Sequence, residues 1–243
     1  MRPEGLPALL EGLGPEWAGL SLTMPLKQTV LGLLDEMSEL AWATGAVNTV
    51  VLRDGHRQGE NTDVHGIVAA LREVGVAQAS AAVVLGGGAT AASALAALAE
   101  LGERAAHVFV RDPGRTGALR DAAERLDVDL VLGRLDEAPG RLRPEIDVLL
   151  STLPAGAADD VSAPVVRALG PEARPVLLDV VYDPWPTLLA RQWPGPVAGG
   201  ALMLLHQAAR QVELMTGQRA PLAAMRAALD ARLLSSPGGH PPM

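Results

Sequence analysis

The sequence predicts an α/β protein built on a doubly wound parallel sheet, preceded by a second, smaller α/β unit. From residue 81 onward, short apolar runs typical of buried strands alternate with helix-length stretches, which is the pattern of parallel β-α-β units. Before residue 81 the pattern is instead a short strand, a helix and a hairpin. The length of 243 residues allows one large or two small domains.

In the first unit, residues 19–23 are expected to form a strand and residues 26–43 one helix after Pro25. Residues 47–52 and 56–60 are expected to pair as a hairpin, because the Asp-Gly between them suits a tight turn. Asp63 precedes an apparent helix over residues 66–74. Its carboxylate could therefore cap that helix as readily as serve a functional site.

In the second unit, a helix is expected over residues 91–101. The expected strands are residues 81–85, 107–110, 147–151 and 175–181. Beyond Gly200 two helices, residues 201–216 and 222–234, are expected to return to the first unit, followed by a disordered tail. We therefore divide the chain into residues 1–63, 64–199 and 200–243.

The composition excludes several classes of protein. Hydrophobic residues make up 49% of the chain and charged residues 20%, which is typical of a globular protein. The net charge of −8 argues against nucleic-acid binding, which needs basic surface. The chain has no apolar run of the ~18 residues that cross a membrane, and its start does not read as a signal peptide, so we expect a cytoplasmic protein. With no cysteine there are no disulfides or thiolate metal sites, and we expect no metal.

Lysine and asparagine are nearly absent. Lys27 is the only lysine among 20 basic residues, and asparagine occurs only as Asn48 and Asn61. Such scarcity suggests a G/C-rich genome that replaces these residues wherever others will serve. Proton transfer is where Lys and Arg differ most, because Lys can lower its pKa and Arg effectively cannot. These three residues are therefore candidates for a functional site.

A glycine turn joins the first strand of the second unit to its first helix. Gly86 and Gly88 occupy the strand-to-helix junction of the dinucleotide fingerprint, where backbone N–H groups meet a pyrophosphate at the positive end of a helix dipole. Ala91 stands where a third glycine would be, which is an accepted replacement. Gly86, Gly88 and Ala89 are candidate cofactor-binding residues of a Rossmann-like unit. A glycine turn without a ligand is the alternative.

The second strand of this unit is followed by Arg111, Asp112 and Arg115. Arginines here would pair with the 2′-phosphate of NADP, whereas an acidic residue would hold the ribose hydroxyls of NAD. The two arginines favour NADP, and Asp112 leaves NAD possible. A solvated charged loop is the alternative without a cofactor.

Six short motifs together resemble shikimate dehydrogenases in order and spacing, over nearly the whole chain from about Trp17 to Gly217. They are residues 22–27 (Leu-Thr-Met-Pro-Leu-Lys), 45–49 (Gly-Ala-Val-Asn-Thr), 61–63 (Asn-Thr-Asp), the turn at Gly86, 179–182 (Asp-Val-Val-Tyr) and 203–207 (Met-Leu-Leu-His-Gln). The resemblance implies NADPH-dependent reduction of 3-dehydroshikimate to shikimate in aromatic amino acid biosynthesis.

The resemblance also implies roles for individual residues. Lys27 and Asp63 match the catalytic pair, in which Lys27 would exchange a proton with the C3 oxygen of the substrate and Asp63 would orient Lys27. Residues matching the substrate-binding positions are Thr23, Asn48, Tyr182 and Gln207. Residues matching the cofactor positions are Arg111, Arg115 and Met203. Tyr182 could equally be a core residue.

The chain departs from the family pattern in places. Val110 and Asp112 replace the Asn and Thr that flank Arg111 in the family, which weakens the NADP assignment. Family members begin with a strand, a Ser-x-Ser loop for the substrate carboxylate, a helix and another strand, which do not precede Met1. We expect the natural start to lie upstream, because the catalytic pair is intact. A truncated paralogue is the alternative.

The expected partner is a small molecule, and the expected assembly is a monomer or homodimer. Two other functions stay open: a quinate/shikimate dehydrogenase that prefers NAD, and a non-catalytic dinucleotide-binding paralogue.

Overall fold

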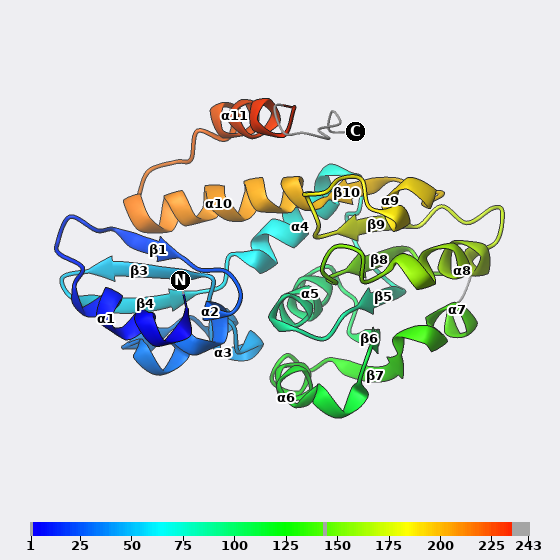
Figure 1. The fold of residues 1–243 in the computed structure, drawn as a ribbon, viewed down its shortest axis with the longest axis horizontal. Helices are drawn as coiled ribbons and strands as arrows, with labels where there is room; N and C mark the ends of the chain where they lie inside the picture. The colour runs from blue at the N-terminus through cyan, green and yellow to red at the C-terminus, as the bar shows by residue number, and fades with distance from the viewer. Residues whose placement is uncertain (1, 143–144, 235–243) are drawn as a thin grey trace.

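The computed structural model describes residues 2–142 and 145–234, which form two sheets joined by long helices (Figure 1). The first sheet has four strands in the order β1-β3-β4-β2. The second has six strands in the order β10-β9-β8-β5-β6-β7, and every pairing in it is parallel. The predicted α/β class with a doubly wound parallel sheet is therefore confirmed.

The first sheet is built around the predicted hairpin. Its strands are β1 (Gly19–Ser21), β2 (Glu36–Met37), β3 (Thr49–Arg53) and β4 (His56–Glu60). At the turn between β3 and β4, Asp54 and Gly55 have φ values of 51° and 79°, the left-handed conformation that such a turn requires. A short 3-10 turn, η1 (Pro3–Gly5), leads into α1 (Leu6–Glu11), whose Leu6 and Leu10 join the buried cluster of this unit.

The single helix predicted over residues 26–43 is wrong. The chain forms α2 (Leu26–Thr29), the 3-10 turn η2 (Val30–Leu33), strand β2 and then α3 (Glu39–Thr44). Leu34 is extended, with ψ of 149°, so the helical path ends there and the next residues pair with β4. Ser38 starts the new helix, because its Oγ accepts the N–H of Ala41 at 3.3 Å. The strand exists through tertiary pairing, which overrides the helical pattern of the sequence.

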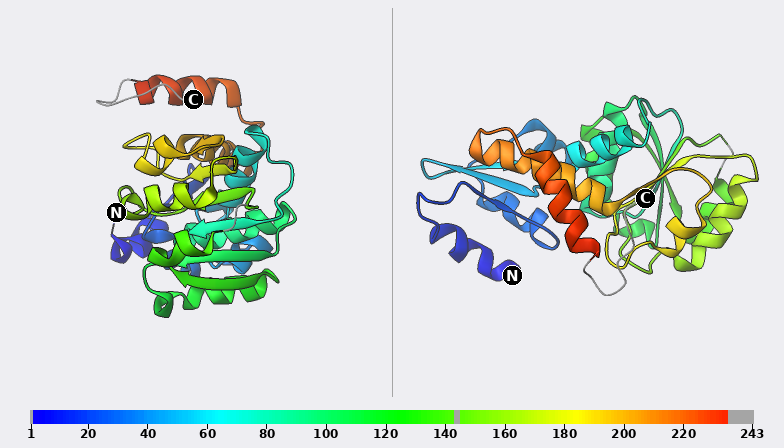
Figure 2. Two further views of the ribbon diagram at one scale, coloured as in Figure 1. Left: turned by 90° about the vertical axis from the view of Figure 1, so that its right-hand side faces the viewer. Right: turned by 90° about the horizontal axis from the view of Figure 1, so that it is seen from above.

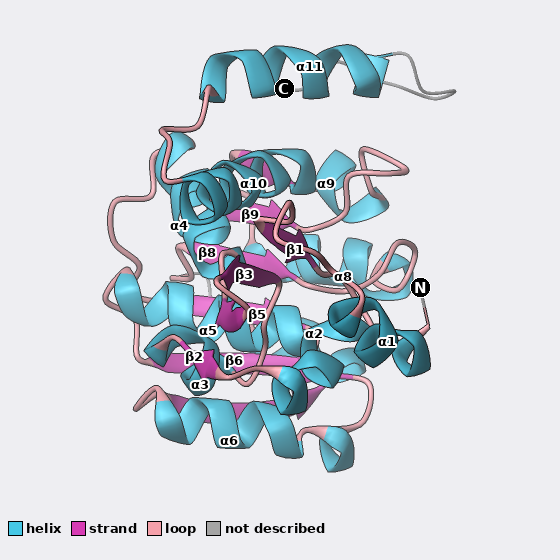
Figure 3. Cartoon of the chain, turned by 90° about the vertical axis from the view of Figure 1, so that its left-hand side faces the viewer, coloured by secondary structure: helices cyan, strands magenta, loops and turns pink. Residues whose placement is uncertain are grey.

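Helices cover both faces of the parallel sheet (Figure 2). Seen from the side of the first sheet, the strands of the second lie stacked in order behind it (Figure 3). The strands are β5 (Ala82–Leu85), β6 (Ala105–Val110), β7 (Asp129–Arg134), β8 (Val148–Ser151), β9 (Val176–Asp179) and β10 (Val197–Gly199). The four strands predicted in this unit are present, whereas β7 and β10 were not predicted.

The helices and 3-10 turns beyond residue 60 follow the predicted alternation with strands. They are α4 (Asp63–Glu73), α5 (Ala89–Glu100), η3 (Pro113–Arg115), α6 (Gly117–Arg125), η4 (Leu135–Glu137), α7 (Ala138–Arg141), α8 (Asp159–Leu169), α9 (Leu188–Gln192), α10 (Gly200–Thr216) and α11 (Leu222–Leu234). None of the described helices is long and apolar enough to cross a membrane.

Helices α4 and α10 run between the two sheets (Figure 1). They approach closely at Gly66, where an added Cβ would lie 2.8 Å from the carbonyl oxygen of Met203 and 2.9 Å from Cβ of Gln207. This crossing brings the start of α4 beside the middle of α10. The division at residues 63 and 199 stays a prediction, and the predicted disordered tail lies outside the described residues.

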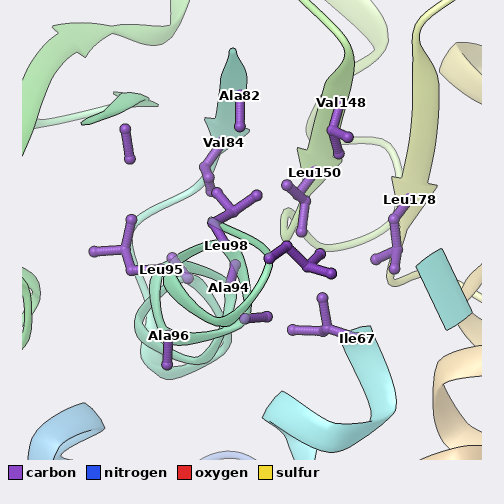
Figure 4. Close-up of a cluster of buried hydrophobic side chains, with 14 of the residues drawn as sticks. Ile67, Ala82, Val84, Ala94, Leu95, Ala96, Leu98, Val148, Leu150 and Leu178 are labelled. Atoms are coloured by element: carbon purple, nitrogen blue, oxygen red, sulfur yellow. The ribbon is translucent and has the colours of Figure 1, made fainter. Parts of the chain in front are cut away.

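The main core lies between the parallel sheet and helices α4 and α5 (Figure 4). Leu98 of α5 points into it and is 1% exposed. Replacing Leu98 with Ala should lower the free energy of unfolding by about 2–5 kcal/mol, because a large buried side chain leaves a cavity. Urea denaturation measures the loss. The control Leu222→Ala, at a position 37% exposed, should change stability by at most about 0.5 kcal/mol. Equal losses in the two variants would contradict this assignment of the core.

Candidate active site

An ion pair between Lys27 and Asp63 joins the start of α2 to the start of α4. The two side chains are only 13% and 6% exposed, so each charge depends on the other for its stabilisation. Asp63 is the first residue of α4, Thr62 occupies the N-cap position, and the Asp63 carboxylate bonds to Lys27 and Asn48 rather than to a backbone N–H of this helix. The alternative that Asp63 serves as a helix cap is therefore wrong.

Asn48 holds the second oxygen of the Asp63 carboxylate. Its Nδ2 donates to Asp63 Oδ1 at 2.8 Å, to Thr62 Oγ1 at 2.9 Å and to Gln207 Oε1 at 3.2 Å. Its Oδ1 accepts the Thr62 backbone N–H at 2.8 Å and the Thr49 hydroxyl at 2.9 Å. Both ends of the buried amide are satisfied, which fixes its orientation. Asp63 is thereby left with one oxygen for Asn48 and one for Lys27.

Backbone pairing places Lys27 beside Asn48. The N–H of Val47 donates to the carbonyl of Lys27 at 2.9 Å, and the N–H of Leu22 donates to the carbonyl of Asn48 at 2.7 Å. The segment from Leu22 to Lys27 is thus held at both ends against the chain entering β3. These backbone hydrogen bonds help to hold the lysine in place, together with the ion pair.

Helix α10 contributes two buried glutamines to the same cluster. Gln207 accepts from Asn48, as described above. Gln211 donates from Nε2 to Thr49 Oγ1 at 2.9 Å and to the Asn48 carbonyl at 3.2 Å. Sequence reasoning missed Gln211. Its signal was the spacing of four residues from Gln207, which places both on one helix face.

Thr23 and Tyr182 do not share in this cluster. Thr23 is exposed, and in the described part of the chain neither side chain has a hydrogen bond to the Lys27–Asp63 pair. Tyr182 is 48% exposed, so the alternative that it is a core residue is wrong. The structure therefore brings together Lys27, Asp63, Asn48 and Gln207, and places these two residues at the surface.

Asp179 is a buried carboxyl at the end of β9, just before Tyr182. It accepts from Thr187 Oγ1 at 2.7 Å and from the backbone N–H of Val181 at 3.2 Å. Burial raises the pKa of Asp179, although these hydrogen bonds oppose the shift. The residue shapes the loop that carries the tyrosine.

The glycine turn has the geometry of an anion site. Gly86 has φ of 114°, and an added Cβ would lie 2.4 Å from Thr152 Oγ1, so only glycine fits there. At Gly88, the extended residue before α5, an added Cβ would have no atom within 4 Å among the described residues. No described side chain caps α5, whose first N–H groups begin at Ala89. The uncapped helix end and the open space beside it fit a pyrophosphate.

Arg111 and Arg115 lie exposed beyond the end of β6, and no ion pair engages either of them among the described residues. Asp112 between them accepts the N–H of Gly114 at 2.9 Å and so caps the turn η3. One oxygen of the Asp112 carboxylate is engaged in its own turn, and the two guanidinium groups beside it, unpaired among the described residues, fit a 2′-phosphate. Met203, the remaining predicted cofactor residue, is buried with the main core on α10.

A doubly wound sheet with an uncapped helix after its glycine turn, next to a buried lysine–carboxylate pair, defines a class: nicotinamide-dinucleotide oxidoreductases that transfer a proton with the hydride. Comparison with known protein families indicates the same class of enzyme. The shikimate dehydrogenase substrate binding domain matches residues 1–50, and the shikimate 5'-dehydrogenase C-terminal domain matches residues 200–229. The chain belongs to the shikimate dehydrogenase family.

Relatives cover nearly the whole chain. Shikimate dehydrogenase (NADP(+)) of Methanothermobacter thermautotrophicus is 34% identical over 94% of this chain and 83% of its own length. The crystal structure of Mycobacterium tuberculosis shikimate dehydrogenase is 39% identical with a TM-score of 0.81, covering 95% of this chain and 84% of that one. The Thermus thermophilus enzyme, solved with NADP(H) and shikimate, is 31% identical with a TM-score of 0.80, covering 96% of this chain and 86% of that one.

The raised pKa of Asp179 gives a stability that depends on pH. A carboxyl with a folded pKa above its unfolded value of about 3.9 stabilises the fold below that pH, and loses this contribution as pH rises through the folded pKa. Asp179→Asn keeps an accepting oxygen but does not titrate. Relative to wild type, the variant should therefore gain stability between about pH 4 and pH 7. Urea denaturation at both pH values measures the difference, and a relative loss as pH rises would contradict the shift.

Proposed function

We propose that this chain catalyses the NADPH-dependent reduction of 3-dehydroshikimate to shikimate, a step of aromatic amino acid biosynthesis. The observation that carries the proposal is the buried Lys27–Asp63 ion pair, held by Asn48 at the position that the family motifs indicate. Family membership and the structural likeness to an enzyme solved with NADP(H) and shikimate support it.

In this mechanism Lys27 is the proton donor and Asp63 its orienting partner. NADPH, when bound at the glycine turn, would supply a hydride for C3 of the substrate. As negative charge develops on the C3 oxygen, Lys27 Nζ donates a proton to it, and Asp63 holds the ammonium in line. A positioned acid of this kind accelerates a reaction by about 10²–10⁴-fold. Asn48 keeps the carboxylate of Asp63 turned toward Lys27 through the 2.8 Å bond to Oδ1.

The remaining predicted residues bind the two substrates in this proposal. Neutral hydrogen-bonding groups suit a polyhydroxylated ring, because a site built to pair hydroxyls rejects analogues that lack them. These groups are Thr23, Asn48, Tyr182 and Gln207. Gly86, Gly88 and Ala89 would hold the pyrophosphate, Arg111 and Arg115 the 2′-phosphate, and Met203 would lie beside the nicotinamide. We further propose a cytoplasmic protein that is a monomer or homodimer.

The direct test is oxidation of shikimate by the purified chain, with NADP⁺ or NAD⁺ as acceptor and quinate as the competing substrate. We expect turnover of shikimate with a higher kcat/KM for NADP⁺, since Arg111 and Arg115, which have no ion pair among the described residues, flank the predicted phosphate site, and one oxygen of Asp112 is bonded to its own turn. Preference for NAD⁺ and quinate would favour the quinate/shikimate alternative. Cofactor binding without oxidation of either compound would favour a non-catalytic paralogue.

Lys27→Ala should lower kcat by at least about 10²-fold, because the proton donor is lost. Lys27→Arg should not restore it, since a guanidinium keeps the charge but effectively cannot give up its proton. Steady-state kinetics measures both, and unchanged affinity for NADP⁺ shows that the variants are folded. Near-normal turnover in Lys27→Ala would eliminate the lysine as the acid.

A further inference from the structure

Asn61 is the one scarce residue that the proposed mechanism does not use. It lies between β4 and α4, two residues before Asp63, and is 4% exposed. Its Nδ2 donates to Thr44 Oγ1 of α3 at 2.9 Å and to Ser93 Oγ of α5 at 3.0 Å. Its Oδ1 accepts the backbone N–H of Asp63 at 3.0 Å. The side-chain amide of Asn61 therefore bonds to three different helices, α3, α5 and α4.

Few other side chains can offer two N–H donors and a carbonyl acceptor from one short side chain, as the amide of Asn61 does here. The Asp63 N–H belongs to the first turn of α4, where backbone donors have no partner within the helix. Asn61 supplies that partner while both hydrogens of its NH₂ group serve hydroxyls on other helices. Aspartate lacks the two donors and alanine lacks every polar atom. A need for both kinds of group explains why asparagine persists here in a chain that has only two.

The bond to Ser93 connects the proton-transfer pair to the cofactor side of the molecule. Ser93 lies four residues after Ala89, within the first turns of the helix that follows the glycine turn, and it is fully buried. The side-chain amide of Asn61 thus bridges the backbone N–H of Asp63 and the hydroxyl of Ser93 on α5. Arg125 also ties the two sides, through a 3.0 Å bond to the Ala43 carbonyl and its position over the Trp42 ring. That tie reaches α3 and does not involve Asp63.

We propose that Asn61 is a positioning residue that sets the placement of the Lys27–Asp63 pair relative to the bound dinucleotide. The inference rests on the proposed function. Hydride and proton transfer need reacting atoms about 3–3.5 Å apart, and an error of about 1 Å can cost 10²-fold in rate. Lys27 lies on α2 beside the first sheet, whereas the glycine turn that would hold the dinucleotide follows β5 of the second. The spacing of the proton and hydride donors therefore depends on the bonds that cross between the two units. Asn61 makes one of these crossing connections, because it bonds both to the backbone of Asp63 and to Ser93 of α5.

Two variants separate positioning from simple support of the fold. Ser93→Ala and Thr44→Val each remove one hydroxyl from the same Asn61 nitrogen, so each leaves one buried N–H unpaired. Ser93→Ala should lower kcat by about 10-fold or more, with KM values for shikimate and NADP⁺ within about two-fold of wild type. It should also increase the primary isotope effect with shikimate deuterated at C3. Thr44→Val should keep kcat within about two-fold, because α3 remains tied to α6 through Arg125.

A double variant supplies the second measurement. Because Asn61 and Ser93 act through one bond, Asn61→Ala combined with Ser93→Ala should lose no more kcat than Asn61→Ala alone. Equal kcat in Ser93→Ala and Thr44→Val, with similar loss of thermal stability, would show only a structural amide and overturn the proposal. A rise in KM with unchanged kcat would overturn it too. Absence of shikimate oxidation in wild type is a different failure: it removes the proposed function and the positioning role with it.

Discussion

The rest of the site depends on the buried ion pair between Lys27 and Asp63. Withdrawing two charges from water costs free energy that their attraction repays only when the geometry is good and the remaining lone pairs are satisfied. Asn48 meets that condition for the carboxylate, and Gln207 and Gln211 in turn hold Asn48. A lysine held in this way presents its ammonium group at one defined point, which a solvated lysine does not.

The fold serves this pair by bringing three distant segments to one place. A backbone hydrogen bond from Val47 holds Lys27 against the segment that enters β3, and α4 begins at Asp63. The close crossing of α4 and α10 at Gly66 then adds the glutamines from the far end of the chain. The parallel sheet carries an uncapped helix end where an anion fits. The site for the dinucleotide and the second substrate is therefore completed by bonds between the unit of the first sheet and the unit of the parallel sheet, not by either unit alone.

The sequence predicted those parts of the structure that depend on local pattern. Buried strands such as residues 81–85 were found because parallel strands are apolar on both faces. The scarcity of lysine and asparagine indicated two asparagines that prove to be buried and a largely buried lysine, all of them hydrogen-bonded. The helix over residues 26–43 was wrong because β2 exists only through pairing with a strand about 20 residues away. Gln211 was missed because burial of a polar residue inside a helix is decided by tertiary packing. The roles of the site residues stay predictions until they are measured.

A double-mutant cycle on Lys27 and Asp63 tests whether the two side chains act as one catalytic unit. Lys27→Met and Asp63→Asn remove one charge each while keeping similar side-chain volume, and kcat/KM for shikimate is measured for both single variants and the double variant. If the two residues act as one unit, the double variant loses no more activity than the more damaged single variant, because groups that act together are not additive. Losses that multiply would mean that the two side chains act independently, and would contradict the account.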